Sequence, residues 1–532
     1  MSRRLRRPPA DSPQEPAMRR FPRVTGFMTV LLLFTAARAM PGQRGAEGGI
    51  RFEVTVDADL QPSRREGRLF VVLGSPGEAE PRQLIGRTGM DSAPIFAVDA
   101  IGVEPGSRHS VEATAYGFPL ASLDEVPAGD YRVQALFDSN IDLKSPNAPG
   151  NLYSDVRAIR LDPAVGVLVE LPLSHRVPDE VLPTSTEHLR FVKLRSSLLS
   201  EFHGRPIYLR AGVILPRDYE QEPDRRYPLR VRIGGYGSRY ARVQRMMADD
   251  SEFREAWLSD AAPRMILLHL DGDGPFGDPY QVNSANHGPY GSAITQELIP
   301  HIEREFRAIR QPHARVLDGG STGGWVSLAL QVFYPDFFNG TWSYCPDGVD
   351  FRAFQLIDIY ADDNAYVNAR GFERPSARDV DGDVRFTMRH EARLENLIGS
   401  RDSWTMSGRQ WGAWNATYGP RGNDGWPVPL WDPETGVLDR DVQAHWERYD
   451  LRLVLERDWS ELGPKLRGKI NVWIGEADNY FLNNAVHYLD DFLAAADPPY
   501  EGRIVYGPGE GHCWVGLSPL EIMQEMGAAV SR

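Results

Sequence analysis

The sequence predicts an α/β protein in which an all-β domain precedes a doubly wound, mostly parallel sheet. Two patterns predict this. After about residue 190, short apolar segments alternate with longer helical patterns, which indicates parallel strands covered by helices on both faces. From about 48 to 175, short segments with alternating apolar and polar residues are separated by Pro, Gly, Asn and Asp, which is typical of a β-sandwich.

The composition is that of a soluble globular protein. Of the 532 residues, 42% are hydrophobic and 25% are charged, and this length suggests roughly two to four domains. The formal net charge is -14 and is spread along the chain. Because phosphate groups bind basic surfaces, we expect no nucleic-acid partner. The motifs CxxC and HExxH are absent, so we expect no zinc site.

The N-terminal segment differs from the rest of the chain. A basic, Pro-rich stretch is followed by the apolar run Phe27–Ala37 and by the small-residue sequence ARA before Met40. This order is typical of a secretory signal peptide, and the run is about half of the roughly 20 residues that a membrane span needs. We expect residues 1–39 to be this signal, with Met18 as an alternative start. The mature protein would be secreted or periplasmic, without a membrane span; an uncleaved anchor is the alternative.

The β-sandwich is expected over residues 48–175 and is Ig-like in its pattern. The segment IRFEVTVDADL (Ile50–Leu60) alternates cleanly between apolar and polar residues. Further strands are expected in RLFVVLG, GSRHSVEATAYGF, GDYRVQALFD and GVLVELPL. In PAGDY, Pro and Gly favour a turn because they set the backbone angles that a turn needs. The polar segment SHRVPDEVLPTSTEH then reads as a linker.

The α/β domain is expected over residues 190–532. Its strands are expected in IYLRAGVILP, YPLRVRIGGYG, RMILLHLDGDG, ARVLDGGS, GTWSYCPDG, KINVWIGEAD and RIVYGPGEGH. Helices are expected in SAITQELIPHIEREFRAI, TGGWVSLALQVFYPDF, NNAVHYLDDFLAAA and from about Pro519 onward. Between about 348 and 465 this alternation stops in a stretch rich in Trp, Arg and Asp. We interpret that stretch as an insertion over the sheet's edge.

The segment GGSTG (Gly319–Gly323) matches G-x-S-x-G, the pattern of a nucleophile elbow. In this motif a serine occupies a strained turn between a strand and a helix, with its hydroxyl exposed above the sheet. Glycines are needed because the strand and helix backbones nearly touch. The apolar ARVL before it and WVSLALQVF after it supply the strand and the helix. A phosphate-binding loop is the alternative, but the Gly-Lys-Ser/Thr of such a loop is absent.

A serine nucleophile needs a base and an acid that orients the base, and in this fold they follow in the order acid, His. Asp478 lies just past the apolar strand INVWIG, where the acid is expected, and Glu476 is the alternative. His512 lies in the Gly-rich turn PGEGHCW after the next strand, which suits a base that must move between two oxygens. His487, expected in a helix, is more typical of a packing residue.

An oxyanion hole needs two backbone donors. One is expected to be the amide of Thr322, directly after the proposed nucleophile. The other is expected in the Gly-rich loop IGGYGSRY, where we favour the Tyr236 amide and keep Gly235 as the alternative. An ordinary tight turn would give the same sequence pattern.

The segments IGGYG, QVNSANHGPYGSAITQELIPHIEREF, GGSTGGW, SYCPDGVDFR and GEGHCW together resemble the putative-esterase family of the α/β-hydrolases. That group is similar to enterochelin, feruloyl and acetylxylan esterases and to esterase D. The resemblance covers about 190–520 without the insertion, and the preceding β-sandwich resembles the N-terminal domain found before some of these esterases. It implies a triad of Ser321, Asp478 and His512. The Trp-rich insertion departs from the simplest members and leaves the acyl pocket undefined.

Two further features bear on the site. Cys345 and Cys513 are both expected near one rim of the sheet, so a disulfide that ties down the His512 loop is one hypothesis, and two small buried residues are the other. The insertion's tryptophans either line a pocket or, as is more common, pack locally. Arg409 and Arg421 lie among them and could hold a carboxylate.

We therefore expect an exported serine carboxylic-ester hydrolase that acts through an acyl-enzyme and needs no cofactor. Its substrate would be a small-molecule or glycan-linked ester. Alternatives are an acyltransferase with the same triad, a non-catalytic protein that binds a glycan or a siderophore, and a peptidase. The sequence predicts neither the acyl group and alcohol of the ester nor the oligomeric state.

Overall fold

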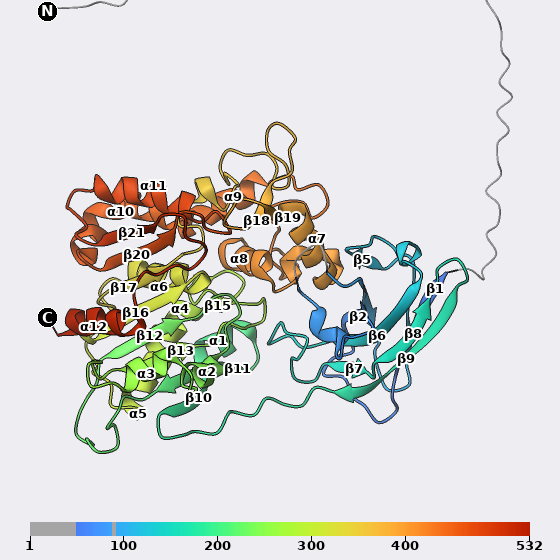
Figure 1. Cartoon of the computed structure of the whole chain (residues 1–532), viewed down its shortest axis with the longest axis horizontal. Helices are drawn as coiled ribbons and strands as arrows, with labels where there is room; N and C mark the ends of the chain where they lie inside the picture. Colours follow the sequence, from blue (N-terminus) through green and yellow to red (C-terminus); the bar gives the residue numbers. More distant parts are fainter. Residues whose placement is uncertain (1–48, 88–91, 532) are drawn as a thin grey trace, which may run out of the picture. The chain divides into compact units, whose positions relative to one another are not determined.

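Two large sheets organise the chain. The computed structural model describes residues 49–87 and 92–531, so the expected signal peptide lies outside the described residues. Figure 1 shows the strands of the first sheet in blue to cyan and those of the second in green to red. Among the described helices, none combines the length and the hydrophobicity that crossing a membrane would require.

The first sheet has nine strands. They are β1 (Ile50–Val56), β2 (Glu66–Gly74), β3 (Ile95–Ile101), β4 (Arg108–Val111), β5 (Tyr116–Phe118), β6 (Gly129–Asp138), β7 (Leu152–Ser154), β8 (Arg157–Leu161) and β9 (Val167–Arg176). Hydrogen bonds join them in the order β4-β1-β9-β7-β6-β2-β3-β5, and β8 pairs with β6. The pair β1 and β9 is parallel, and the other pairs are antiparallel.

The core of the first sheet follows from the alternation in the sequence. In β1 every second residue is buried, from Ile50 to Val56, because neighbouring side chains of a strand point to opposite faces. Apolar residues of β1 and β9 meet those of β2 and β6 in one cluster, although other strands separate these pairs in the sheet. The sheet therefore curls around its core. On its other face, β2 and β6 pack against Leu394 and Leu397 of a later helix.

The second sheet has eight strands in the order β10-β11-β13-β12-β16-β17-β20-β21. They are β10 (Leu189–Ser196), β11 (Ile207–Ile214), β12 (Leu229–Ile233), β13 (Ile266–Leu270), β16 (Arg315–Gly320), β17 (Thr341–Tyr344), β20 (Ile470–Gly475) and β21 (Arg503–Gly507). The first two pairs are antiparallel and the remaining pairs are parallel. The mostly parallel sheet expected from the sequence is thus present, and its parallel strands carry their carboxyl ends to one edge.

In the part of the chain that the structure describes, twelve α-helices accompany the strands. They are α1 (Ser197–His203), α2 (Val243–Met246), α3 (Glu252–Leu258), α4 (Tyr290–Ala293), α5 (Ile299–Glu305), α6 (Thr322–Phe333), α7 (Met388–Ile398), α8 (Gln410–Tyr418), α9 (Arg440–Trp446), α10 (Leu451–Leu466), α11 (Asn483–Ala494) and α12 (Pro519–Val530). Two short ribbons are also present: β14 (Asn283–Ser284) with β15 (Gly288–Pro289), and β18 (Pro375–Arg378) with β19 (Val384–Thr387).

Neighbouring residues of β17 show that helices lie on both faces of the second sheet. Ser343 donates a hydrogen bond to the Gly324 carbonyl of α6 at 2.8 Å, and Trp342 donates to Glu525 of α12 at 3.0 Å. Consecutive side chains of a strand point to opposite faces. Helices α6 and α12 therefore cover opposite faces of the sheet near the end of β16.

The expected insertion contains α7 to α10 and the ribbon of β18 and β19, all between β17 and β20. Its aromatic residues form much of its core, since Trp404, Trp411, Trp414 and Trp431 are at most 2% exposed. Trp404 stacks on Trp431 with ring centroids 4.2 Å apart. Local packing is thus the role of most of these tryptophans, for which the sequence allowed either packing or the lining of a pocket.

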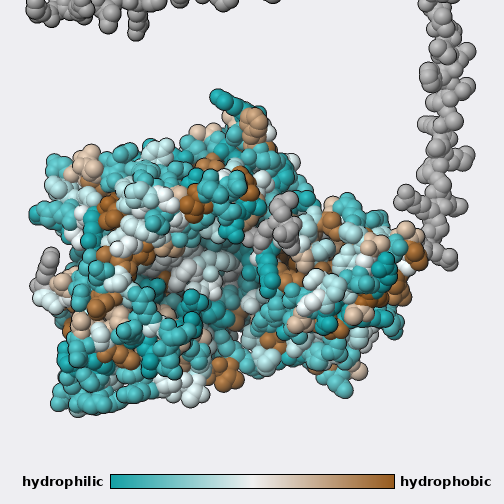
Figure 2. All heavy atoms as spheres, viewed as in Figure 1, coloured by the Kyte–Doolittle hydropathy of each residue, from teal (hydrophilic) through white to brown (hydrophobic). Residues whose placement is uncertain are grey.

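The surface carries no large hydrophobic patch on the face seen in Figure 2, where hydrophobic residues are scattered among hydrophilic ones. The most exposed large hydrophobic side chains among the described residues are Val181 and Ile101, with exposures of 84% and 79%. Isolated residues of this kind are normal on soluble proteins.

Candidate active site

Ser321 occupies a strained turn between β16 and α6. Its backbone angles are φ 58° and ψ −124°, in a region that costs a residue other than glycine on the order of 1–3 kcal/mol. Its amide donates to the Tyr344 carbonyl at 3.0 Å, which fixes the turn against the end of β17. The turn places the serine at the carboxyl edge of the sheet, with the helix α6 starting at the next residue.

The glycines around Ser321 are required by close backbone contacts. A Cβ atom at Gly319 would lie 2.3 Å from the Gly323 carbonyl oxygen. One at Gly323 would lie 2.2 Å from the carbonyl oxygen of Ile233, in β12. Real Cβ atoms do not approach that closely, so only glycine lets the elbow sit against the neighbouring strand. The Gly-rich spacing that predicts an elbow thus has its expected steric cause.

The buried Asp318 anchors the strand that ends at the elbow. Its carboxylate accepts two hydrogen bonds from Arg230, at 2.9 and 2.6 Å, and is also paired with Arg232. Burial raises the pKa of Asp318, whereas the two guanidinium groups lower it, and the net shift is downward. The carboxylate is therefore ionised and links β16 to β12.

His512 and Asp478 are hydrogen-bonded to each other. The Nδ1 atom of His512 lies 2.8 Å from Oδ2 of Asp478, and the Asp478 side chain is completely buried. Its Oδ1 accepts from the amides of Tyr480 and Leu482, at 2.9 and 3.2 Å. The Asn479 side chain accepts from the His512 amide at 2.9 Å. These contacts fix the imidazole so that Nε2 is its free nitrogen.

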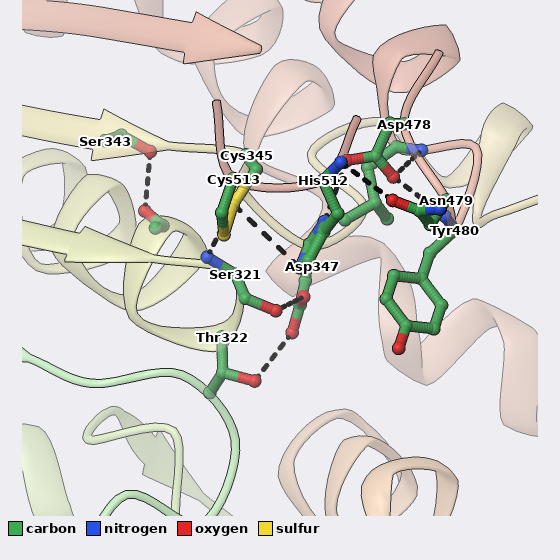
Figure 3. Close-up of a disulfide and its surroundings, with 12 residues drawn as sticks. Ser321, Thr322, Ser343, Cys345, Asp347, Asp478, Asn479, Tyr480, His512 and Cys513 are labelled. Atoms are coloured by element: carbon green, nitrogen blue, oxygen red, sulfur yellow. Dashed lines mark hydrogen bonds and ion pairs between the residues drawn. A yellow bond between two sulfur atoms is a disulfide. The ribbon is translucent and has the colours of Figure 1, made fainter. Parts of the chain in front are cut away.

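The hydroxyl of Ser321 is not hydrogen-bonded to His512 in this conformation (Figure 3). Its Oγ instead donates weakly to Oδ1 of Asp347, at 3.5 Å. The Nε2 atom of His512 lies 4.0 Å from Sγ of Cys345. Ser321 and His512 nevertheless line the same cavity.

Asp347 is a buried carboxylate that the sequence analysis does not single out. Its Oδ2 accepts from Tyr280 at 2.7 Å, Thr322 at 3.0 Å, Gln410 at 3.1 Å and Trp414 at 3.2 Å. Burial raises its pKa, and the hydrogen bonds from Tyr280 and Thr322 oppose that rise. One oxygen is thus saturated with donors while the other faces Ser321 (Figure 3).

A disulfide joins Cys345 to Cys513, with the two Cα atoms 4.8 Å apart. It connects the end of β17 to the residue after His512, which confirms the hypothesis that a bridge ties down this loop. The Sγ atom of Cys345 also accepts from the Ser321 amide at 3.1 Å. The two sulfurs and His512 lie close enough to hold a metal ion, but disulfide sulfurs are not thiolate ligands.

The loop after β12, which contains Gly235 and Tyr236, approaches the elbow at Ser321. A Cβ atom at Gly235 would lie 3.8 Å from Cβ of Ser321. The Tyr236 hydroxyl donates to the Gly408 carbonyl, and the next amide, of Gly237, donates to Asp278 at 3.2 Å. Burial raises the pKa of Asp278 to about 8. The loop is thus fixed on both sides of the Tyr236 amide.

Two cavities meet at Ser321 and His512. The first has a volume of about 330 Å³ and is lined mainly by the insertion. The second, of about 750 Å³, is more open and is lined by the loop Gly234–Arg239 together with Arg242 and His269. Tyr236 lines both cavities. An ester whose carbonyl lies over the serine would therefore have room on either side.

The alternatives weighed in the sequence lie elsewhere. Glu476 is exposed and does not line either cavity. A further histidine, His287, is buried, its pKa is lowered to about 3 by burial, and it packs edge-on against Phe276. His487 stacks on Tyr506 at 4.7 Å. Arg421 is exposed and lies over the Phe202 ring.

Residues from the insertion complete the first cavity, and the sequence analysis does not place them. Gln410 and Trp414 come from α8, and Arg409 directly precedes that helix. Nothing in the local pattern could have located them, because the insertion has no clear period. Asp347 did leave a signal: it is an acidic residue just past the strand next to the nucleophile's strand, where parallel strands bring their ends together.

Comparisons with known proteins give one family match and several similar solved structures. Residues 208–421 match the sequence model of the family described as putative esterase. A solved ferulic acid esterase is 16% identical, with a TM-score of 0.38, and the match covers 64% of this chain and 97% of that one. An S-formylglutathione hydrolase from Agrobacterium tumefaciens is 13% identical, with a TM-score of 0.34 and coverages of 66% and 97%.

A third solved structure is FphF, a fluorophosphonate-binding serine hydrolase of Staphylococcus aureus. It is 12% identical, with a TM-score of 0.36, and the match covers 64% of this chain and 98% of that one. No curated protein matches the chain. The sheet order, the elbow and the family match define an enzyme of the α/β-hydrolase class. Residues 208–421 thus carry the sequence pattern of the putative esterase family.

Proposed function

We propose that the protein is an exported serine carboxylic-ester hydrolase in which Ser321, His512 and Asp478 form the triad. The observation that carries the proposal is the hydrogen bond between His512 and the buried Asp478. His512 lines the same cavity as Ser321, which has a positive φ. An acid that holds one imidazole nitrogen leaves the other free to accept a proton. A strained turn exposes the serine hydroxyl to substrate.

In the proposed reaction, Ser321 Oγ turns from Asp347 toward Nε2 of His512, which takes its proton. The Oγ atom forms a bond to the ester carbonyl carbon, and the tetrahedral intermediate then breaks its bond to the alcohol oxygen. His512 returns the proton to that oxygen, and the alcohol leaves. Water attacks the acyl-enzyme in the same way and releases the acid.

The amides of Thr322 and Tyr236 are proposed to hold the negative oxygen of the intermediate. Thr322 is the first residue of α6, so its amide also lies at the positive end of the helix dipole. The close approach of Gly235 to Ser321, where an added Cβ atom would lie 3.8 Å from Cβ of the serine, supports the assignment to this loop. This chemistry uses only side chains and backbone of the chain, and we propose no cofactor.

The test is hydrolysis of p-nitrophenyl acetate and butyrate by residues 40–532. We expect turnover by the wild type and a loss of roughly 10⁶-fold, to the assay background, in Ser321→Ala. Ser327→Ala is the matched control, because this serine lies in the same helix α6 and donates to the Gly324 carbonyl. Equal rates for wild type and Ser321→Ala would overturn the proposal.

An acyltransferase would use the same triad with a sugar or glycerol hydroxyl in place of water. Added glycerol then accepts the acyl group faster than water does, and product analysis by mass spectrometry separates the two activities. Transfer as the main reaction would replace hydrolysis in the proposal. The absence of any reaction and of labelling at Ser321 would favour a glycan- or siderophore-binding protein.

We further propose that residues 1–39 direct export and that a β-sandwich domain over 48–175 precedes the doubly wound hydrolase domain over 190–532. The disulfide supports an oxidising compartment, because such bonds are rare in the cytosol. The curled first sheet supports the sandwich. N-terminal sequencing of protein from the culture medium or periplasm is expected to begin near Met40; a cytosolic protein beginning at Met1 or Met18 would contradict export.

A further inference from the structure

The first cavity beside Ser321 contains one cationic side chain, Arg409. The remaining wall combines apolar side chains such as Leu394 and Phe386, carboxyl groups, and neutral polar side chains such as Gln355 and Gln410. The Arg409 side chain comes from the residue before α8. No carboxylate of the described residues pairs with its guanidinium, whereas other partly buried arginines there, such as Arg210 and Arg374, have one.

The nearby carboxyl groups are already engaged by other donors. The two oxygens of Glu395 accept from the amides of Trp411 and Gly412, each at 2.9 Å, and from Ser407 at 2.7 Å. Burial raises the pKa of Glu395 to about 8, so it is mostly protonated at neutral pH. These groups therefore do not pair with Arg409. Burial raises the pKa of Asp138, and the charge of Arg409 is among the causes that oppose this rise.

Asp347 and Glu391 are engaged in the same way. Asp347 receives its donors from Tyr280, Thr322, Gln410 and Trp414. Glu391 accepts from the Ser376 hydroxyl and from the Trp411 indole, the latter at 3.1 Å. Burial raises the pKa of Glu391, which favours its neutral form.

The guanidinium of Arg409 is held in place by the first sheet's loop. Its Nη2 donates to the Ile85 carbonyl at 3.2 Å. A Cβ atom at Gly86 would lie 2.3 Å from its Cζ, so the loop leaves room for the guanidinium only because this residue is glycine. The Nε–H of Arg409 is buried and has no partner among the described residues. A donor that is withdrawn from water without a partner is costly, and a bound anion would satisfy it.

We infer that Arg409 binds a carboxylate group of the ester substrate in the cavity next to Ser321. A guanidinium presents a planar fork that matches a carboxylate with two parallel hydrogen bonds. The apolar wall of the cavity then contacts the carbon chain between the carboxylate and the reacting ester. The inference rests on the proposed ester hydrolysis at Ser321, and it assigns the substrate class: an ester with an acidic group on one of its halves.

The experiment has two arms, because the carboxylate can belong to the acyl half or to the alcohol half of the ester. In the first arm, p-nitrophenyl hemiesters of succinic, glutaric and adipic acid are compared with p-nitrophenyl valerate. In the second arm, 4-acetoxybenzoate is compared with the neutral 4-acetoxybenzamide. Rates are corrected with Ser321→Ala, which removes spontaneous hydrolysis from the comparison.

In one of the two arms, kcat/KM of the wild type is expected to be higher for the carboxylate ester than for the matched neutral ester. Arg409→Gln is expected to lower that kcat/KM by roughly 10- to 100-fold, mainly through KM, and to leave the neutral ester unchanged. Arg409→Lys keeps the positive charge but not the planar guanidinium. Its kcat/KM for the carboxylate substrate is expected to lie between those of the wild type and Arg409→Gln. Arg421→Gln is the matched control, since this arginine of the insertion is exposed and outside both cavities.

Two results would overturn the inference. One is a preference for neutral esters in both arms, and the other is a carboxylate preference that survives in Arg409→Gln. Either can occur while Ser321-dependent hydrolysis of the neutral esters remains, so that the proposed function stands and only the substrate class falls. If no ester is hydrolysed and Ser321 is not labelled by a fluorophosphonate, the proposed function itself falls, and the inference falls with it.

Discussion

Asp478 holds His512 through one oxygen and is itself held through the other. Its Oδ2 lies 2.8 Å from Nδ1 of the imidazole, and its Oδ1 accepts from two backbone amides of the following turn. The carboxylate is completely buried, so water does not compete for these bonds. The hydrogen bond to Asp478 sets both the tautomer and the orientation of the His512 imidazole, the proposed base.

Asp478→Asn is expected to reduce kcat by about 10⁴-fold with little change in fold, because the amide stabilises the wrong tautomer of the imidazole. The measurement is kcat for p-nitrophenyl butyrate together with a circular dichroism spectrum. Glu476→Gln is the control: this exposed residue was the alternative acid, and its variant is expected to keep nearly full activity. A large loss in Glu476→Gln, with activity kept in Asp478→Asn, would reverse the assignment.

The bridge between Cys345 and Cys513 is expected to support both stability and activity. Replacing both cysteines by serine removes the link between β17 and the His512 loop, and it is expected to lower the free energy of unfolding by about 2–5 kcal/mol. Urea denaturation measures this change. Dithiothreitol is expected to lower the activity of the wild type but not that of the double variant. Two titratable thiols in the unreduced wild type would show that the bridge is absent.

Much of the scaffold of the site follows from the sequence, and the walls of the cavity do not. The pattern ARVLDGGS predicts a strand and a turn, and the structure has β16 ending at Gly320 with α6 starting at Thr322. The glycines of this segment determine the turn between β16 and α6, so the local sequence is enough to predict it. Arg409 lines the cavity through a contact with Ile85, which is 324 positions away in the chain, and no local pattern encodes such a contact.

The same contrast separates Asp478 from Asp347. Asp478 follows a buried strand at the place where this fold expects an acid, so the chain order singles it out. Asp347 also follows a strand, but its environment comes from Tyr280, Gln410 and Trp414, which lie on three separate segments. Burial and donor geometry, rather than residue type, distinguish it from the other acidic residues of the chain.

Asp278 is expected to make stability depend on pH. Burial raises its folded-state pKa to about 8, above the unfolded value of 3.8, so the folded state binds a proton that the unfolded state releases. The stabilisation is therefore complete below about pH 4 and is lost as pH rises toward 8. Asp278→Asn is expected to reduce this decline by about 1.4 kcal/mol per pH unit between pH 5 and 7. Urea denaturation across this range measures it; parallel curves for variant and wild type would contradict the assignment.

Gly86→Ala is expected to displace the Arg409 side chain, although the two residues are far apart in the sequence. The new Cβ atom would lie 2.3 Å from the guanidinium carbon, so the side chain must move away from the cavity wall. The variant is expected to lose the preference for carboxylate esters while it keeps the hydrolysis of neutral ones. The measurement is kcat/KM for the carboxylate ester that the wild type prefers and for its matched neutral ester.

Gly102→Ala is the matched control for this variant. Gly102 also has a positive φ, of 76° against 88° at Gly86, but nothing lies within 4 Å of its added Cβ atom. Both variants are expected to lose about 1 kcal/mol of stability from the backbone conformation. A loss of the carboxylate preference in both variants would mean that general destabilisation, and not the displaced guanidinium, is the cause.

The most direct test of the central claim is to label the protein with a fluorophosphonate and to map the adduct by peptide mass spectrometry. We expect one adduct on the peptide that contains Ser321, loss of esterase activity in proportion to labelling, and no adduct in Ser321→Ala or after denaturation. Full esterase activity in a protein that carries no adduct, or an adduct on another serine that tracks the activity, would contradict the account.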